Sequence, residues 1–147
     1  MASTFDLATF PHVAFVPISD KDKALAFYRD ILGLALIEDQ SPFALVFELN
    51  GTKSTNGTKG TNGTNGTMLR ASFDPGFKPQ PFTILGWQVV DIALSVPALE
   101  SAGVVFNRYQ WMNLAEGQPA IWTAPGGARI AWFQDPFGNV LSLQQNP

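Results

Sequence analysis

Cysteine is absent from this chain of 147 residues, and histidine occurs only once. Without cysteine there are no disulfides, thiolate metal sites or cysteine nucleophiles, and such a chain suits a reducing compartment. The single histidine and the lack of a Gly-x-Ser-x-Gly motif argue against a serine–histidine–acid triad. The nine Lys and Arg residues are scattered and are outnumbered by twelve Asp and Glu. Because no basic stripe can follow a phosphate backbone, we expect no nucleic-acid partner.

Long hydrophobic runs are also missing. No apolar stretch approaches the roughly 18 residues of a membrane span, and residues 1–6 lack a positive region followed by an apolar run. The hydrophobic content of 46% can nevertheless supply the core of one domain or of two small fused modules. These features predict a cytoplasmic protein with no membrane partner.

The first half of the chain reads as one strand, one helix and three further strands. Residues 13–18 are β-branched and aromatic, and Ser19 with Asp22 three positions later resembles a capping box at a helix start. Apolar side chains then recur at helical spacing, and Gly33 supplies the left-handed residue that ends a helix. The buried face of this helix is expected at Ala24, Phe27, Tyr28 and Ile31, and the three strands at residues 34–37, 43–49 and 68–73.

The second half repeats this order, and the repeat predicts two modules with the same arrangement of strands and helix. Residues 103–106 occupy the position in the second half that residues 33–36 occupy in the first. In the same way, residues 138–142 correspond to residues 66–70. Strands are expected at residues 83–90, 129–133 and 140–144, with an additional short one at 120–124.

Pro97 complicates the second helix. If that helix starts right after Asp91, the proline lies beyond its first turn and costs about 3 kcal/mol in a regular helix. The alternative is a later start with Ser95 as the cap. We expect a short or kinked helix.

Residues 50–67 have low complexity, because Asn-Gly-Thr occurs four times and no side chain in the segment is apolar. Such a segment cannot build core. We interpret it as the expanded tip of a hairpin whose strands end at Leu49 and start at Met68.

Two motifs point to a known family. The first is residues 19–28, closed by Leu32-Gly33-Leu34, and the second is Asp-Pro-Phe-Gly-Asn-Val-Leu-Ser-Leu at residues 135–143. Together they resemble the vicinal oxygen chelate superfamily, which includes glyoxalase I, bleomycin-resistance proteins and extradiol dioxygenases. The resemblance implies an α+β fold of two tandem βαβββ modules that form an open, cavity-bearing barrel. We expect an N-terminal arm at residues 1–12, a first module at 13–73 with an insertion at 51–66, a linker at 74–82 and a second module at 83–147.

The resemblance also implies where a metal would bind, because metal-dependent members carry one ligand on the first and one on the last strand of each module. The matching positions here are Val13, Arg70, Leu85 and Ser142. A divalent cation needs imidazole or carboxylate ligands, which these positions do not supply. The neighbouring His12 is turned to the other face by strand alternation unless a bulge intervenes. We expect no metal and no cofactor.

Arg70 places a permanent positive charge where the relatives hold a metal ion. Its guanidinium can pair bidentately with a carboxylate or phosphate of a ligand. Alternatively, it pairs with Glu48 on the preceding strand, and the sequence leaves both alternatives open. If both hold, a ligand competes with Glu48 in the cavity.

Aromatic residues make up 12% of the chain. By alternation, Phe15 and Trp87 share a face with Val13 and Leu85, so we expect them to line the cavity. Trp111 and Trp122 flank the loop at residues 112–119, at the cavity rim. Core packing or an oligomer contact is the alternative for each ring, and it is favoured for Trp132.

These observations predict a metal-independent small-molecule binding protein of the bleomycin-resistance type, which takes an apolar or aromatic ligand with an anionic group. The alternative is a glyoxalase- or dioxygenase-like enzyme, either a lyase or an oxidoreductase, including a metal-free one that uses Arg70 and Glu48. Because both faces of the strands are apolar and need cover, we expect a homodimer. The predicted ligand-binding residues are Arg70, Ser142, Trp87, Phe15, Glu48 and Trp122.

The repeat segment should be dispensable. Replacing residues 50–67 by a single Asn-Gly-Thr keeps a hairpin turn and shortens the loop whose ends must be brought together. We expect an unchanged or slightly higher midpoint of thermal unfolding. A shortened variant that unfolds, or that changes its oligomeric mass in light scattering, would show that the segment makes stabilising contacts.

Overall fold

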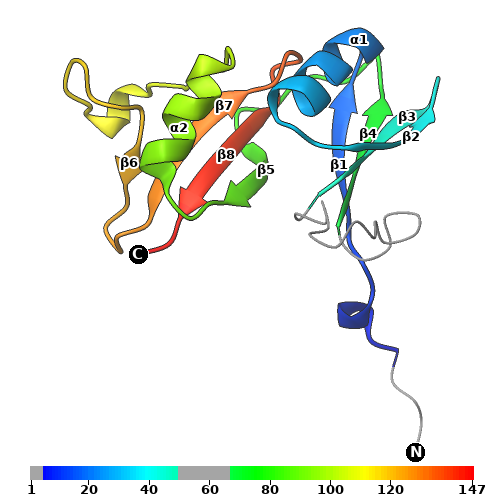
Figure 1. Cartoon of the computed structure of the whole chain (residues 1–147), viewed down its shortest axis with the longest axis horizontal. Helices are drawn as coiled ribbons and strands as arrows, with labels where there is room; N and C mark the ends of the chain where they lie inside the picture. The colour runs from blue at the N-terminus through cyan, green and yellow to red at the C-terminus, as the bar shows by residue number, and fades with distance from the viewer. Residues whose placement is uncertain (1–4, 50–66) are drawn as a thin grey trace, which may run out of the picture.

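The computed structural model describes residues 5–49 and 67–147, so the predicted hairpin tip lies outside the described residues. The chain forms two four-stranded sheets, sheet A with the order β1-β4-β3-β2 and sheet B with the order β5-β8-β7-β6 (Figure 1). Strands β1 and β4 run parallel, as do β5 and β8, and the remaining pairs are antiparallel. The predicted order of strand, helix and three strands, repeated twice, is confirmed.

Sheet A consists of β1 (Val13–Ile18), β2 (Leu36–Gln40), β3 (Ala44–Glu48) and β4 (Met68–Phe73). Sheet B consists of β5 (Thr83–Gln88), β6 (Trp122–Thr123), β7 (Arg129–Gln134) and β8 (Val140–Gln145). The helical segments are η1 (Leu7–Thr9), α1 (Lys21–Ala24), its π-helical continuation η2 (Leu25–Ile31), α2 (Ile92–Ser101) and η4 (Gln110–Met112).

The first helix begins one residue later than predicted. Asp20, and not Ser19, is the cap, because its Oδ1 accepts a hydrogen bond from the backbone N–H of Lys23 at 2.9 Å. The predicted apolar face is confirmed, with Ala24, Phe27 and Tyr28 buried. Gly33 ends the helix with a φ of 81°, which lies in the left-handed region.

The second helix starts directly after Asp91, whose Oδ1 accepts a hydrogen bond from the N–H of Ala93 at 3.0 Å. The alternative start with Ser95 as the cap is wrong. Pro97 is tolerated inside this ten-residue helix because both Pro97 and Ala93 are exposed. Proline has no N–H to donate to the carbonyl of Ala93, and this carbonyl lies on the side of the helix that faces water.

The second module departs from the first at its second strand. Residues 103–106 form no strand, and Phe106 makes only an isolated bridge with Phe133. The chain then leaves the sheet through η4 and returns as β6, where Trp122 pairs with Ile130 of β7. The additional short strand expected at residues 120–124 is therefore the fourth strand of sheet B.

A single core joins the two modules, and the segment η2 lies between the two sheets (Figure 1). The ring of Phe27 lies 6.3 Å from that of Phe133 in sheet B, and the ring of Tyr28 lies 5.8 Å from that of Phe47 in sheet A. The Tyr28 hydroxyl donates to the buried carboxylate of Asp135 at 2.5 Å. Burial raises the pKa of Tyr28 well above its usual value, and the negative charge of Asp135 raises it further.

Asp135 is satisfied by several donors at once. It accepts hydrogen bonds from the backbone N–H groups of Phe137 and Asn139 at 2.9 Å each, and from Asn139 Nδ2 at 2.8 Å. The same Nδ2 donates to the carbonyl of Pro17 in β1 at 2.9 Å. The turn after β7 is thus tied both to η2 and to the first strand of sheet A.

The Tyr28 hydroxyl should contribute measurably to stability. We expect Tyr28→Phe to lower the free energy of unfolding by about 1.5–3 kcal/mol, the range for a hydrogen bond to a charged group. Because the folded-state pKa of Tyr28 is raised, this contribution is fully present below the ordinary tyrosine pKa of about 10 and is lost as the pH rises above it. Urea unfolding between pH 6 and pH 11 measures both effects.

Tyr109→Phe is the matched control, because Tyr109 is the other tyrosine, is half-buried, and its hydroxyl accepts a hydrogen bond from a neutral group, Asn107 Nδ2, at 2.8 Å. Equal losses for the two substitutions would contradict the role assigned to the buried pair.

Candidate functional site

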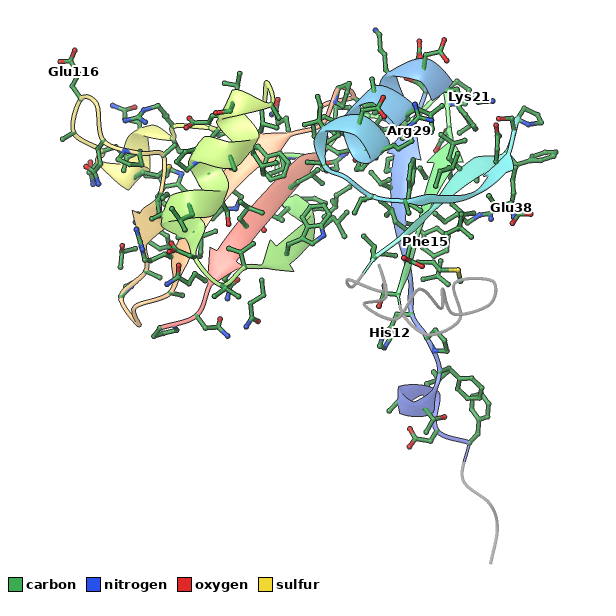
Figure 2. All side chains as sticks on the ribbon, viewed as in Figure 1. His12, Phe15, Lys21, Arg29, Glu38 and Glu116 are labelled. Carbon is green, nitrogen blue, oxygen red and sulfur yellow. The ribbon has the colours of Figure 1, made fainter. Side chains whose placement is uncertain are left out.

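Each sheet has one face covered by helices and one helix-free face, here called the open face. In sheet A, Val16, Ile18, Leu69 and Ala71 point into the core. Strand alternation therefore sends Val13, Phe15 and Arg70 to the open face. This face is accessible in a single chain, since Phe15 is 60% exposed and Val13 is 44% exposed. Figure 2 shows Phe15 and Glu38 on this sheet.

Arg70 occupies the middle of the open face of sheet A. It pairs with Phe15 of β1 on one side and with Val46 of β3 on the other. Its Nη1 donates to Gln40 Oε1 at 2.5 Å, and Gln40 Nε2 in turn donates to Glu38 Oε2 at 2.7 Å. The ion pairs among the described residues are Lys21 with Asp39 and Arg29 with Asp30, so Arg70 is not neutralised by direct contact with a carboxylate.

A guanidinium carries five N–H donors, and Gln40 uses only one of them. The neutral amide also holds the arginine in place without cancelling its charge. The remaining donors are therefore available for an anion that approaches the open face.

Glu48 lies on the same face, two residues after Val46 in β3, and pairs with Met68 of β4. Glu48 as a whole is 6% exposed. Its carboxylate makes no hydrogen bond or ion pair within the described part of the chain. The Arg70–Glu48 pair that the sequence left open is thus not formed. The amide of Gln40, brought close by the β2–β3 hairpin, is the partner that sequence reasoning missed.

Ser142 lies on the open face of sheet B, opposite Gly86 of β5 and Trp132 of β7. A Cβ atom added to Gly86 would come within 2.5 Å of Ser142 Oγ. The glycine therefore leaves the space that this hydroxyl occupies. Ser142 and Arg70, predicted to be equivalent positions of the two modules, lie on the open faces of their two sheets.

Trp87 and Leu85 are on the other face of sheet B, which corrects the prediction that they share a face with Phe15. Their partners, Leu143 and Leu141, are buried in the core. The pairing of β5 with β8 shifts its register between Thr83 and Leu85, and such a shift changes which side chains point to a given face. Trp87 instead lines two clefts, one of about 540 Å³ that Ala14 and Glu48 also line, and one of about 350 Å³ beside α2.

Four aromatic rings form a cluster at the open face of sheet B, here called the aromatic shelf: Tyr109, Trp111, Trp122 and Trp132. Tyr109 and Trp111 are stacked, with an interplanar angle of 9° and ring centroids 5.6 Å apart. Trp111 then meets Trp122 edge-on at 5.2 Å and Trp132 at 5.5 Å. Trp132 Nε1 donates to Thr83 Oγ1 at 3.1 Å, which fixes its ring.

The shelf presents aromatic ring surface to its surroundings, because Trp111 is 52% exposed. The rings contact one another, so they leave no central space for a cation such as an aromatic cage would have. The sequence pattern predicts Trp111 and Trp122 at a cavity rim, favours core packing or an oligomer contact for Trp132, and gives no signal for Tyr109. The alternation of Trp132 with the buried Ala131 and Phe133 was the signal available for its position.

The donor set does not fit a divalent cation. Pairing of β1 with β4 is continuous from Val13 to Ile18, without a bulge, so His12 is not turned toward the open face. Figure 2 shows His12 at the start of β1, where it is exposed. Within residues 5–49 and 67–147, no group of three or more His, Cys, Asp or Glu side chains could hold a metal ion. In the same residues, no helix is long and apolar enough to cross a membrane.

The fold defines a class of paired βαβββ modules, in which α1–η2 and α2 leave one face of each sheet uncovered. The model of the Glyoxalase/Bleomycin resistance protein/Dioxygenase superfamily matches residues 9–143, and the chain belongs to this superfamily. The recognition made from the two sequence motifs is therefore confirmed. None of the curated proteins matches the chain.

Solved structures share the fold. A glyoxalase family protein from Bacillus anthracis is 16% identical, with a TM-score of 0.64 and complete coverage of both chains (100% each). A superfamily member from Sphaerobacter thermophilus DSM 20745 is 24% identical over 94% of this chain and 98% of its own, with a TM-score of 0.64. TnmS3, an antibiotic binding protein from Streptomyces sp. CB03234, is 24% identical over 100% of this chain and 99% of its own, with a TM-score of 0.62.

Proposed function

We propose that the protein is a metal-independent small-molecule binding protein whose ligand has an apolar or aromatic body and an anionic group. The observation that carries this proposal is Arg70, a cation at the centre of an accessible sheet face that, among the described residues, donates a hydrogen bond to a neutral amide and forms no ion pair. We place the protein in the cytoplasm, because a chain without cysteine suits a reducing compartment.

Arg70 supports the anionic part of the ligand. Phe15 and Val46 flank the arginine, and their apolar surface excludes water from part of its surroundings. A charge-assisted hydrogen bond is stronger in such surroundings than in bulk water. A carboxylate or phosphate bound there would take the donors that Gln40 leaves unused.

The aromatic shelf supports the aromatic part of the ligand. Stacking on an indole favours flat rings over bulky aliphatic groups of similar area. That TnmS3 is an antibiotic binding protein also favours binding over catalysis, although its similarity to this chain establishes only the fold.

We further propose that the protein acts as a homodimer. The open faces of sheets A and B both expose large apolar side chains, including Phe15 at 60% and Trp111 at 52%. Exposed apolar faces of this kind mark interaction or ligand sites. Two chains related by a two-fold axis can place sheet A of each against sheet B of the other, which makes two equivalent cavities.

A metal-free enzyme is the second candidate, and Glu48 favours it. Glu48 supplies a carboxylate on the open face of sheet A that makes no hydrogen bond or ion pair within the described residues, and such a carboxylate can act as a general base for a substrate that lies against it. Incubation of a bound compound with the protein separates the two functions. A binding protein returns the compound unchanged, whereas an enzyme converts it and loses this activity on Glu48→Gln.

Ligand binding should not depend on a metal ion, because the four family positions offer no imidazole or carboxylate. We expect elemental analysis of dialysed protein to find no stoichiometric transition metal, and EDTA to leave the midpoint of thermal unfolding unchanged. One equivalent of metal per chain that is lost on Arg70→Met or Ser142→Ala would contradict metal independence.

Substitution of Arg70 tests the anion site. We expect Arg70→Met to weaken the binding of naphthalene-2-carboxylate by about 1.5–3 kcal/mol, the range for a charged hydrogen bond, and to leave naphthalene-2-carboxamide nearly unaffected. Isothermal titration with both probes measures the difference. Arg29→Met is the matched control, since Arg29 is an exposed cation on η2 that pairs with Asp30.

A loss of stability in Arg70→Met without a change in the preference for the carboxylate would refute the anion site. The arginine would then serve only to hold Gln40 and Glu38 in place.

A further inference from the structure

Glu48 combines near-complete burial with a carboxylate that has no partner. Within the described residues this carboxylate makes no hydrogen bond or ion pair, yet Glu48 as a whole is 6% exposed. A carboxylate that leaves bulk water is destabilising unless another group replaces the hydrogen bonds it loses. None of the fully buried side-chain oxygen or nitrogen atoms that the structure describes lacks a partner. The Glu48 oxygens therefore still reach the surface of the sheet, where a ligand can contact them.

Glu48 and Arg70 are neighbours on the open face of sheet A. Glu48 lies opposite Met68 in the pairing of β3 with β4, and Arg70, two residues after Met68, lies opposite Val46. Diagonal neighbours of this kind in an antiparallel pair are about 7–8 Å apart. The two side chains are long enough to meet over this distance, but they form no ion pair.

Hydrogen bonds on the other side of Arg70 explain why the two charges stay apart. Arg70 Nη1 donates to Gln40 Oε1, and Gln40 Nε2 donates to Glu38 Oε2. Gln40 and Glu38 belong to β2, and β3 lies between β2 and β4. The guanidinium therefore reaches across β3 toward β2, and it does not reach along β3 toward Glu48. One face thus presents a positive and a negative group that do not neutralise each other.

A ligand that carries both charges complements such a face. The ammonium group of a primary amine has three N–H donors for an unpartnered carboxylate, and a ligand carboxylate accepts from the guanidinium. In an α-amino acid the two groups are attached to the same carbon. With one hydrogen bond at each end they span about 8 Å, which matches the spacing of diagonal neighbours in a sheet. Val13 and Phe15 of β1, at 44% and 60% exposure, offer apolar surface beside these two rows for an aromatic side chain.

We infer that the open face of sheet A binds a zwitterion with an aromatic body, whose carboxylate contacts Arg70 and whose ammonium group, close to that carboxylate, contacts Glu48. This inference rests on the proposed function and narrows its ligand class from aromatic acids to aromatic α-amino acids. Glu48 is the residue that selects for the amine.

Two probes that differ in one ammonium group test the role of Glu48. Isothermal titration at neutral pH compares 3-(2-naphthyl)propanoate with each enantiomer of 3-(2-naphthyl)alanine. We expect the better enantiomer to bind about 10- to 100-fold more tightly than the propanoate, the factor for a hydrogen bond between charged groups. Glu48→Gln should remove this preference. The affinity for the propanoate should stay the same or rise slightly, because a repelling charge is lost.

Glu100→Gln is the matched control, because Glu100 is an exposed carboxylate on α2, which packs on the opposite side of the other sheet. This variant should keep the full preference for the amino acid. Thermal unfolding checks that Glu48→Gln is folded, and we expect its midpoint to be equal or higher, because the substitution keeps the shape of the side chain and removes a charge without a partner.

A second pair of probes tests the spacing of the charges. The compound 6-(aminomethyl)naphthalene-2-carboxylate carries the same two groups at opposite ends of the ring system. It should bind no more tightly than naphthalene-2-carboxylate, because its ammonium group lies too far from its carboxylate to reach Glu48 when Arg70 is occupied.

The outcomes separate this inference from the proposed function. If the propanoate does not bind, or binds equally well to Arg70→Met, the anion site and the zwitterion site are both refuted. If the propanoate binds through Arg70 but the amino acid binds no more tightly, or if Glu48→Gln keeps the preference, the zwitterion site alone is overturned. An equal gain in affinity from the widely separated charges would also overturn it, since the net charge of the ligand would then explain the preference.

Discussion

The buried hydrogen bond from Tyr28 to Asp135 is the interaction on which the arrangement of this molecule depends. Tyr28 belongs to the helix of the first module, and Asp135 begins the last turn of the second. The same carboxylate holds Asn139, which donates to the carbonyl of Pro17 in β1. A buried carboxylate without these donors would be strongly destabilising. These hydrogen bonds tie the helix and the first strand of the first module to the last turn of the second module. The long helices lie on the other faces of the two sheets and leave the open faces uncovered.

The two open faces differ in chemistry, and this difference supports the proposed ligand site. The face of sheet A carries a cation held by a neutral amide, and the face of sheet B carries stacked and edge-on aromatic rings. These two chemistries support the proposal of a ligand with an aromatic body and one anionic group. Among the described residues, neither face gathers the three imidazole or carboxylate groups that a catalytic metal needs. The superfamily fold is thus retained in this chain, while its metal positions hold other chemistry.

Much of this could be predicted from sequence because the signals were local. Helical spacing identified Ala24, Phe27 and Tyr28 as buried, and the turn glycine Gly33 marked the end of the helix. Alternation in β1 correctly placed Val13 and Phe15 on one face, since the β1–β4 pairing has no irregularity. The same reasoning failed for Trp87, because a register shift near the start of β5 cannot be seen in a pattern of apolar residues. The sequence also leaves Ser95 open as a helix cap, because the spacing alone does not show that Pro97 and Ala93 lie on the side of the helix that faces water.

The sequence by itself determined the family, the two-module order and the residue types at the four family positions, since these follow from residue types at fixed spacings. Only the tertiary structure decided what each polar side chain contacts. Arg70 and Gln40 are thirty residues apart and meet because β2, β3 and β4 lie side by side, so the hydrogen bond goes to Gln40 and not to Glu48. Tyr109, Trp111, Trp122 and Trp132 become one surface only after η4 and β6 fold back on β7. Contacts between distant segments depend on sheet order and register, which no local pattern in the chain encodes.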